Sequence, residues 1–191
     1  MTSISIIGTG NMGQAIASVA AQGGHDVQQL GTDAGATAVT GEIVVLAVPY
    51  PAVADVISAR REQFAGRIVV DITNPLDFAT FDSLVVPADS SAAAEIAAKL
   101  PESTVLKAFN TTFAGTLAAG NVGALTTTVL VAGDDADAKA TLVGVIESGG
   151  LDALDAGSLK RARELEAVGF LQLTLAAAEK ISWTGGFGIV S

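Results

Sequence analysis

Three glycines close to the N-terminus have a spacing that suits a phosphate-binding turn. The segment reads Gly8-Thr9-Gly10-Asn11-Met12-Gly13, and it stands directly after an apolar stretch and directly before a helical pattern. In this arrangement the first glycine permits a tight turn, the second lets the backbone approach a diphosphate, and the third lets the helix pack closely on the strand. The first N–H groups of the helix then offer a partial positive charge to the phosphates. The segment therefore predicts a dinucleotide site; a glycine-rich turn that binds nothing is the alternative interpretation.

The turn after the next apolar segment, Gly31-Thr32-Asp33, is where such sites distinguish NAD from NADP. An acidic residue at this turn binds the ribose 2′-hydroxyl of NAD, whereas a basic residue accepts the 2′-phosphate of NADP. Thr32 can donate a hydrogen bond to a phosphate, but Asp33 repels one, and no Arg or Lys follows before Arg60. Taken alone, these residues favour NAD slightly.

Polar residues also follow the other apolar segments of the predicted sheet. Open α/β sheets bind ligands beyond the carboxyl ends of their strands. These ends contribute amides, hydroxyls and backbone groups but no His, Cys or Lys, so acyl transfer lacks an activated nucleophile. Hydride transfer between two rings needs none, because the cofactor carries the chemistry while the protein orients it and excludes water. Besides the glycine segment, the candidate cofactor-binding residues are Gly31, Thr32, Asp33, Val48, Pro49, Tyr50, Thr73, Asn74 and Pro75.

Asn110 and Thr111 are the candidate catalytic residues, as the floor beneath the nicotinamide or its partner ring. An asparagine that caps the following short helix is an equally good interpretation of Asn110. Tyr50, between two prolines, either stacks on a ring or is a partly buried surface residue. His25 falls at the amino end of the sheet, which is the wrong end for catalysis, and is interpreted as a turn residue.

The C-terminal part of the chain offers a basic cluster and an aromatic residue. The cluster at residues 160–163 either meets an anionic acceptor or pairs with Glu164 and Glu166 at a surface or a dimer contact. An apolar stripe is interpreted as core or interface; it consists of Phe170, Leu171, Leu173, Thr174 and Ala177. Trp183 and the glycine-rich tail after it either line the acceptor pocket or pack against a second subunit.

Apolar segments and helical patterns alternate along the chain, which predicts right-handed crossovers and an α/β fold with a parallel, doubly wound sheet of the Rossmann type. We expect residues 1–156 to form the dinucleotide-binding domain and residues 157–191 a small C-terminal helical lobe with the acceptor site and the dimer contact. A longer loop is predicted at 76–89. The predicted strands span 3–7, 26–30, 42–48, 67–72, 104–109, 126–132 and 151–154, and the predicted helices span 11–22, 49–64, 90–100, 113–119, 134–147 and 159–181.

The composition narrows the classes of partner and compartment. The chain has 191 residues and a formal net charge of −10, and such an acidic surface repels nucleic acid and anionic membranes. The chain has no cysteine, which excludes disulfides, thiolate catalysis and most structural zinc sites, so we expect no metal site and a reducing, cytoplasmic location. We see no signal-peptide pattern and no apolar run near the roughly 20 residues that span a membrane.

Four segments in order carry a resemblance to a known family: the glycine segment, Ala47-Val48-Pro49, Asn74-Pro75-Leu76 and Ala108-Phe109-Asn110-Thr111. Over nearly its whole length the chain resembles the NADPH-dependent deazaflavin (coenzyme F420) oxidoreductases and their small dinucleotide-binding relatives. The Ala-Phe-Asn-Thr segment is also similar to the reductase domain of the six-transmembrane epithelial antigen of prostate metalloreductases. Asp155-Ala156-Gly157, before the last long helix, fits the family pattern too.

The resemblance implies a Rossmann domain, a small C-terminal lobe, a homodimer, and hydride transfer between NADP(H) and a flavin-like acceptor. Two residues depart from the family pattern. Asp33 stands where NADP-preferring members often carry a basic residue, and Asn110 stands where the deazaflavin enzymes can carry a His. On family grounds NADP ranks first as the cofactor and NAD second.

The leading hypothesis is therefore an NAD(P)H-dependent oxidoreductase, a homodimer that transfers a hydride to a deazaflavin, flavin or related small-molecule acceptor. The alternative is a non-catalytic redox sensor, which would bind NAD(P) without turnover. A third hypothesis is an imine reductase similar to pyrroline-5-carboxylate reductase. Those enzymes add a longer helical dimerisation domain, for which the roughly 35 residues after Gly157 are too few.

Overall fold

The computed structural model describes residues 1–31 and 37–190, along which strands and helices alternate. The strands are β1 (Ser3–Ile7), β2 (Asp26–Leu30), β3 (Ile43–Leu46), β4 (Ile68–Asp71), β5 (Thr104–Lys107), β6 (Asn121–Val122), β7 (Leu125–Thr126), β8 (Thr128–Gly133) and β9 (Asp152–Gly157). The helices are α1 (Asn11–Gln22), α2 (Tyr50–Phe64), α3 (Ala92–Lys99), α4 (Ala114–Ala119), α5 (Ala136–Ser148) and α6 (Ala162–Ala177), with a 3-10 turn at Leu159–Arg161. The hairpin of β6 and β7 was not expected from the sequence.

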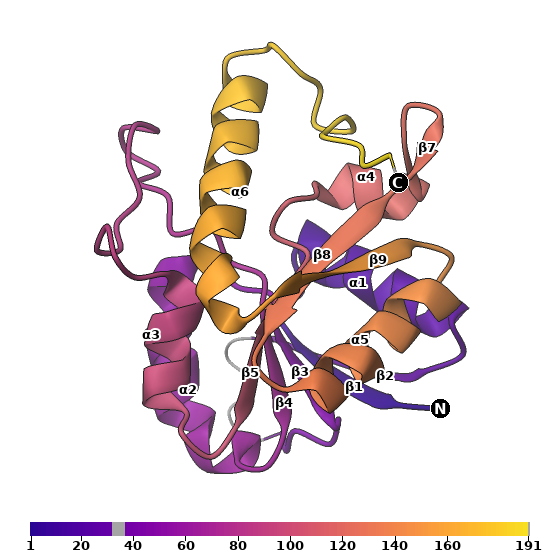
Figure 1. Ribbon diagram of the computed structural model, residues 1–191. Coiled ribbons are helices and arrows are strands. Elements are labelled where there is room, and N and C mark those ends of the chain that lie inside the picture. The colour runs from indigo at the N-terminus through magenta and orange to yellow at the C-terminus, as the bar shows by residue number, and fades with distance from the viewer. Residues whose placement is uncertain (32–36, 191) are drawn as a thin grey trace.

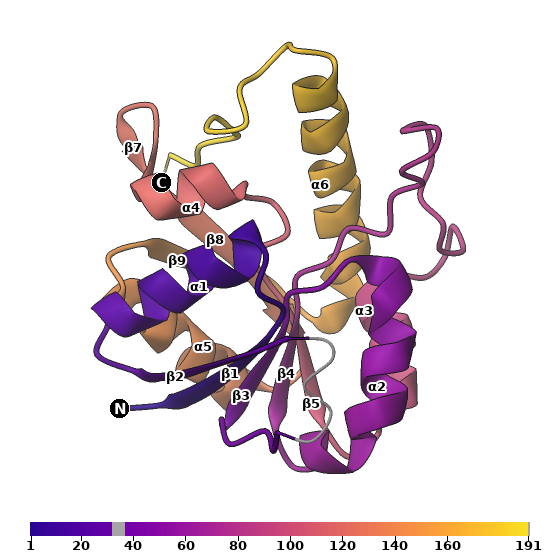
Figure 2. The same cartoon turned by 180° about the vertical axis from the view of Figure 1, so that it is seen from behind.

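One sheet of seven strands organises the described chain, in the order β2-β1-β3-β4-β5-β8-β9. Helices α2 and α3 lie on one face, and α1 and α5 lie on the other (Figure 1; seen from behind in Figure 2). The predicted α/β fold of the Rossmann type is thus confirmed. Among the described residues, no helix combines the length and the apolar character needed to cross a membrane.

The strands at the centre of the sheet are buried on both faces because helices cover both. Successive side chains of a strand point to opposite faces, and β1 shows the consequence. Ile4 and Ile6 pack into a core with α1 and α5, where Leu142 is also buried, whereas Ile7 packs into a second core with Ile57 of α2. The uninterrupted apolar strands are therefore a direct result of the two-sided cover.

The sheet is not parallel throughout, and on this point the sequence prediction is wrong. Strands β5 and β8 pair antiparallel, with Leu106 opposite Gly133 and Lys107 opposite Ala132. The connection between them holds only the six-residue helix α4 and the short hairpin, and neither crosses a face of the sheet (Figure 1). A parallel neighbour requires such a crossing. The chain therefore re-enters the sheet from the end at which it left β5. As a result, β8 and β9 run antiparallel to the other five strands.

The C-terminal segment lies beyond the carboxyl ends of the first strands of the sheet. From the far end of α6 the tail arches across to α4 (Figures 1 and 2). Thr116 Oγ1 donates a 2.6 Å hydrogen bond to the carbonyl oxygen of Gly185, and the ring of Trp183 lies 5.0 Å from that of Phe113. The predicted boundary between the two domains, at residue 157, falls at the end of β9. The division of the chain into two domains stays a prediction.

Candidate active site

The glycine segment forms the turn between β1 and α1, where the order of the strands reverses. Because β1 lies between β2 and β3, the turn opens into the crevice where sheets of this kind bind ligands. Gly8 has φ +127°, which favours glycine, and a Cβ atom there would collide with the carbonyl oxygen of Ala47. A Cβ atom at Gly13 would collide with the carbonyl oxygen of Gly8. The backbone of the turn therefore requires both glycines.

Gly10 is different, because the described part of the chain leaves room for a side chain at this position. A Cβ atom there would have no atom of the described residues within 4 Å. Gly10 is also the cap of α1, and the start of this helix has no side-chain cap hydrogen bond among residues 1–31 and 37–190. In α3, by contrast, Ser91 accepts a hydrogen bond from the backbone N–H of Ala94. The open space at Gly10 and the uncapped start of α1 fit a diphosphate.

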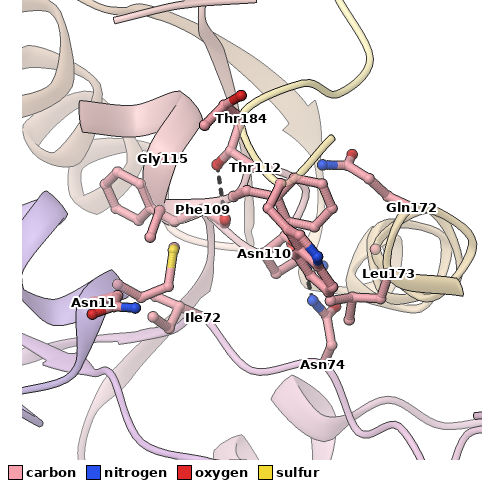
Figure 3. Close-up of a pocket in the computed structure, with 15 residues that line it drawn as sticks. Asn11, Ile72, Asn74, Phe109, Asn110, Thr112, Gly115, Gln172, Leu173 and Thr184 are labelled. Atoms are coloured by element: carbon pink, nitrogen blue, oxygen red, sulfur yellow. Dashed lines mark hydrogen bonds between the residues drawn. The ribbon is translucent and has the colours of Figure 1, made fainter. Parts of the chain in front are cut away.

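A cavity of about 480 Å³ lies beside this turn, within the usual range of small-molecule sites (Figure 3). Its walls come from the start of α1, the ends of β4 and β5, α4, α6 and the tail. Among the described residues that line it, none carries a charged side chain. The polar lining residues are Asn11, Asn74, Asn110, Thr112, Gln172 and Thr184.

A strained turn after β5 places Asn110 in the wall of the cavity. The preceding residue, Phe109, is buried and has φ +62°, which is rare for a bulky side chain. Thr112 supports the turn, because its Oγ1 donates a 2.9 Å hydrogen bond to the carbonyl oxygen of Phe109 (Figure 3). Strained residues of this kind cluster at functional sites.

Asn74 and Asn110 bind each other at the base of the cavity. Asn110 Nδ2 donates to Asn74 Oδ1, and Asn74 Nδ2 donates to the carbonyl oxygen of Asn110, each over 2.9 Å. Asn110 Nδ2 also donates to the carbonyl oxygen of Leu165 in α6, at 2.9 Å. Helix α6 comes so close that a Cβ atom at Gly169 would collide with Asn74 Oδ1. The pair therefore joins two strands and a helix.

The second interpretation of Asn110, as a helix cap, is wrong. The cap of α4 is Phe113, and no side chain binds the first N–H groups of that helix. Instead, Asn110 Oδ1 is buried without a hydrogen-bond partner among the described residues. A buried acceptor without a partner costs about 1–3 kcal/mol, so this oxygen is suited to a ligand that donates a hydrogen bond.

Three buried charges form a network behind the asparagine pair. Lys107 Nζ lies 2.8 Å from Asp71 Oδ2 and 2.9 Å from Glu166 Oε1. Asp71 and Lys107 face each other in neighbouring strands β4 and β5, and Lys107 also donates to the carbonyl oxygen of Thr73. Glu166 accepts hydrogen bonds of 2.9 and 3.3 Å from the first two N–H groups of α3. The network thus fastens α3 and α6 to the sheet edge that carries the cavity.

The interpretation in which Glu166 pairs with the basic cluster is wrong, because only 1% of the residue is exposed and its ion-pair partner is Lys107. Burial raises the pKa of its carboxyl above the ordinary value, and the Lys107 ammonium and the Ala92 N–H oppose that shift. The basic cluster pairs with Glu164 instead, through Arg161 at 3.5 Å. Sequence analysis missed Lys107 as a buried residue at a strand end.

Of the predicted site residues, Asn11, Met12, Asn74 and Asn110 line the cavity. Thr111 is buried but is not part of the lining, whereas its neighbour Thr112 is. The others do not line the cavity: Gly8, Thr9, Gly10 and Gly13 in the glycine turn, Gly31 after β2, Val48, Pro49 and Tyr50 after β3, and Thr73 and Pro75 after β4. Thr32 and Asp33 lie outside the described residues.

Tyr50 and His25 both have structural partners. The hydroxyl of Tyr50 donates a 2.6 Å hydrogen bond to Glu95 Oε2 on α3, and burial together with this bond raises its pKa. His25 Nδ1 accepts a 3.1 Å hydrogen bond from the backbone N–H of Thr2, and His25 Nε2 lies 2.9 Å from Ser148 Oγ. The interpretation of His25 as a turn residue at the amino edge is confirmed.

Helix α6 and the tail supply lining residues that sequence analysis did not identify, above all Gly169, Gln172 and Thr184. Gln172 is 1% exposed, and its Oε1 has no hydrogen-bond partner among the described residues. Gly169 and Gln172 interrupt an otherwise apolar stretch of helix, and this interruption was the available signal. Trp183 lines the cavity, in agreement with one of the two interpretations of the tail.

Comparisons with known proteins identify relatives of this chain. A family model described as NADP oxidoreductase, coenzyme F420-dependent, matches residues 27–75. The F420-dependent NADP reductase of Methanocaldococcus jannaschii is 30% identical over 168 residues, which cover 86% of this chain and 75% of that protein. The crystal structure of a protein assigned as an F420-dependent NADP-reductase from Arthrobacter sp. FB24 has a TM-score of 0.86 and 27% identity, with 100% of both chains covered.

A second kind of relative matches a shorter stretch. Metalloreductase STEAP3 of Rattus norvegicus is 37% identical over 107 residues, which are 56% of this chain but only 21% of that protein. This match agrees with the similarity of the Ala-Phe-Asn-Thr segment to the metalloreductases. The identity and coverage of the archaeal reductase, together with the family model and the shared structure, show that the chain belongs to the coenzyme F420-dependent NADP oxidoreductase family.

Proposed function

We propose that this protein is an NADPH-dependent oxidoreductase that reduces a deazaflavin, and that its cavity holds the nicotinamide and the acceptor ring in contact. Membership of the family supports this chemistry. The observation that carries the proposal is the uncharged cavity directly beside the glycine turn, with the Oδ1 atom of Asn110 unpaired in its wall. A site without a nucleophile or a charged acid suits hydride transfer, in which orientation matters most.

The residues of the chain hold and orient the two ring systems. Bound NADPH supplies a hydride from its nicotinamide ring. The open backbone at Gly10 and the start of α1 hold the diphosphate, and the amide pair of Asn74 and Asn110 forms the floor under the reacting rings. Phe113 and Trp183 exclude water from one wall. The proton that completes reduction of the acceptor comes from solvent.

We assign the cofactor to the residues predicted from the sequence. Gly8–Gly13 bind the diphosphate, and Gly31, Thr32 and Asp33 bind the adenosine ribose. Asp33 governs the choice between NADP and NAD, and family membership favours NADP. The nicotinamide half is assigned to Val48, Pro49, Tyr50, Thr73, Asn74 and Pro75, with Asn110 and Thr111 at the reacting rings.

We also propose a homodimer in which residues 157–191 provide both acceptor site and dimer contact. The side chains of Val168 and Leu171 on α6 are 37% and 51% exposed outside the cavity. Phe78 and Val85 are exposed in the loop beside α6. Exposed apolar residues of this kind are candidates for an interaction surface. We expect Leu171→Glu to give a monomer in analytical ultracentrifugation, and a monomeric wild type would contradict this. A cytoplasmic location and the lack of nucleic-acid partners stay predictions from composition.

The direct test has two parts. First, binding of NADPH and NADH is measured side by side by calorimetry, and NADPH is expected to bind more tightly. Second, NADPH is mixed with deazaflavins and flavins, and its oxidation is followed by the loss of nicotinamide absorbance. Binding without oxidation across the panel would indicate a redox sensor, and failure of both coenzymes to bind would contradict the proposal.

A further inference from the structure

We propose that Gln172 recognises the imide edge of the acceptor, which is the ring N–H flanked by two carbonyl groups in a pyrimidinedione. Deazaflavins and flavins share this edge. The inference rests on the proposed function, because it assigns a specificity-determining residue to the acceptor half of the same cavity. No motif in the sequence assigns this role to Gln172.

The first support is the state of the Gln172 side chain. It projects from α6 into the cavity (Figure 3), yet the residue is 1% exposed. Its Oε1 is buried and has no hydrogen-bond partner among the described residues. A buried acceptor of this kind is costly unless something donates to it. The structure therefore presents a fixed carbonyl oxygen to which a ligand can donate the missing hydrogen bond.

The second support is the position of Gln172 within the cavity. It lies across the cavity from Asn11, which begins α1 (Figure 3). A nicotinamide connected to a diphosphate at α1 approaches from the side of Asn11, so the ring next to Gln172 is the acceptor. The tail confines the amide on this side, because a Cβ atom at Gly186 would lie only 3.3 Å from Gln172 Nε2.

The third support is chemical complementarity. The primary amide of glutamine carries one carbonyl acceptor and one N–H₂ donor side by side. An imide edge presents the reverse pattern, with an N–H donor next to a carbonyl acceptor. Gln172 Oε1 thus accepts from the imide N–H, while Nε2 donates to a neighbouring carbonyl. Since no charged residue lines the described cavity, this neutral two-point contact selects a neutral ring over an anionic one.

The test uses 5-deazariboflavin and its N3-methyl derivative, in which the imide N–H is replaced. Binding of each oxidised compound to the full-length protein is followed by fluorescence titration, and reduction by NADPH is followed separately. Loss of one hydrogen bond to a buried acceptor is expected to raise the Kd of wild type for the N3-methyl compound about tenfold. In Gln172→Leu the two compounds are expected to bind equally.

Two further variants keep the test decisive. Gln172→Glu retains the acceptor oxygen and loses the donor, so it is expected to bind both compounds more weakly while keeping the preference for the N–H form. Gln22→Leu, at the exposed end of α1, is the matched control and is expected to behave as wild type. The glutamate variant also answers the question if the leucine variant does not fold.

The outcomes separate this inference from the proposed function. Equal binding of the two compounds to wild type, or a tenfold preference that persists in Gln172→Leu, overturns the role of Gln172 even if NADPH reduces both. Loss of the preference for the N–H form in Gln172→Glu also overturns it. If the preference follows residue 172 but no hydride transfer occurs, the proposed reaction fails and the imide contact stands. If neither compound binds, both fail.

Discussion

Asn74 and Asn110 join the ends of β4 and β5 through two hydrogen bonds of 2.9 Å, one in each direction. The same Nδ2 atom of Asn110 reaches the carbonyl oxygen of Leu165 in α6. Three elements that are distant in the sequence therefore meet at one amide group. Because these elements line the cavity, we expect its shape to depend on this amide.

Replacing Asn110 by Asp tests this dependence. The carboxylate cannot donate to Asn74 Oδ1 or to the Leu165 carbonyl oxygen, each of which lies 2.9 Å from Asn110 Nδ2 in wild type. Unpaired buried groups cost about 1–3 kcal/mol each, so the free energy of unfolding in urea is expected to fall by at least about 2 kcal/mol. Hydride transfer is expected to slow as well.

Asn121→Asp is the matched control for this change. Asn121 is exposed in the β6–β7 hairpin, where its Nδ2 donates to the Ala119 carbonyl oxygen at 3.0 Å. Surface changes of this kind shift stability by about 0.5 kcal/mol or less. If the two variants lose stability equally, the structural importance of the Asn110 amide is refuted.

Two lysines allow the buried charge network to be compared with a surface ion pair. Lys107 lies between Asp71 and Glu166 and is fully buried, whereas Lys139 pairs at 2.7 Å with Asp155, whose side chain is 56% exposed. Lys107→Met leaves two buried carboxylates without their cation and is expected to cost about 3–5 kcal/mol. Lys139→Met is expected to cost less than about 1 kcal/mol. Urea unfolding of both variants checks this order, and a similar cost for both would show that the network contributes little.

Stability is expected to depend on pH through Glu166. Burial raises the pKa of this carboxyl in the folded protein above the ordinary value of 4.5. The folded state then binds the proton more tightly than the unfolded state. The stabilisation that proton binding at Glu166 adds to the folded state is therefore complete below pH 4.5, and it is lost as the pH rises through the pKa of the folded protein.

Glu166→Gln removes this titration. Relative to the variant, wild type is expected to lose free energy of unfolding as the pH is raised from 4.5 toward neutrality. Urea unfolding of both proteins over this range provides the measurement. A constant difference, or one that grows in favour of wild type at higher pH, would mean that Lys107 outweighs burial.

Local patterns in the sequence were sufficient to predict the first half of the fold. The sequence predicts β1, α1 and β2 with the bounds found in the structure, because a buried apolar strand, a glycine turn and an amphipathic helix are each encoded within a few residues. The direction of β8 was not predictable in this way. It depends on whether the connection after β5 crosses the sheet, and a six-residue helix and a hairpin leave no distinct periodicity.

The residues of the candidate site also fall into two groups: those that local patterns predict and those that depend on long-range packing. Asn11, Met12, Asn74 and Asn110 follow strands directly, so the rule that ligands lie at the carboxyl edge identified them. Gln172 reaches the cavity because α6 folds back over that edge, and the interruption of an apolar stretch does not by itself reveal such long-range packing. The sequence offered Glu166 only as a partner of the nearby basic cluster, because its true partner, Lys107, is 59 residues away in the chain. Long-range pairing of this kind leaves no local signal.

The diphosphate assignment is tested by adding one methyl group at Gly10. No atom of the residues that the structure describes lies within 4 Å of this space, and the backbone has φ −73° and ψ 179°, which alanine also adopts. Gly10→Ala is therefore expected to change the free energy of unfolding by less than about 1 kcal/mol. If the diphosphate lies against this backbone, the Kd for NADPH in calorimetry is expected to rise at least about tenfold.

Gly144→Ala is the matched control, because Gly144 is exposed within α5 and a Cβ atom there also has nothing within 4 Å. Alanine is preferred to glycine inside a helix, so this variant is expected to gain about 0.5–1 kcal/mol of stability and to bind NADPH as wild type does. If Gly10→Ala binds NADPH as tightly as wild type, the diphosphate does not lie at the start of α1. The nicotinamide would then have no fixed route into the cavity, so this one substitution tests the placement of the whole cofactor.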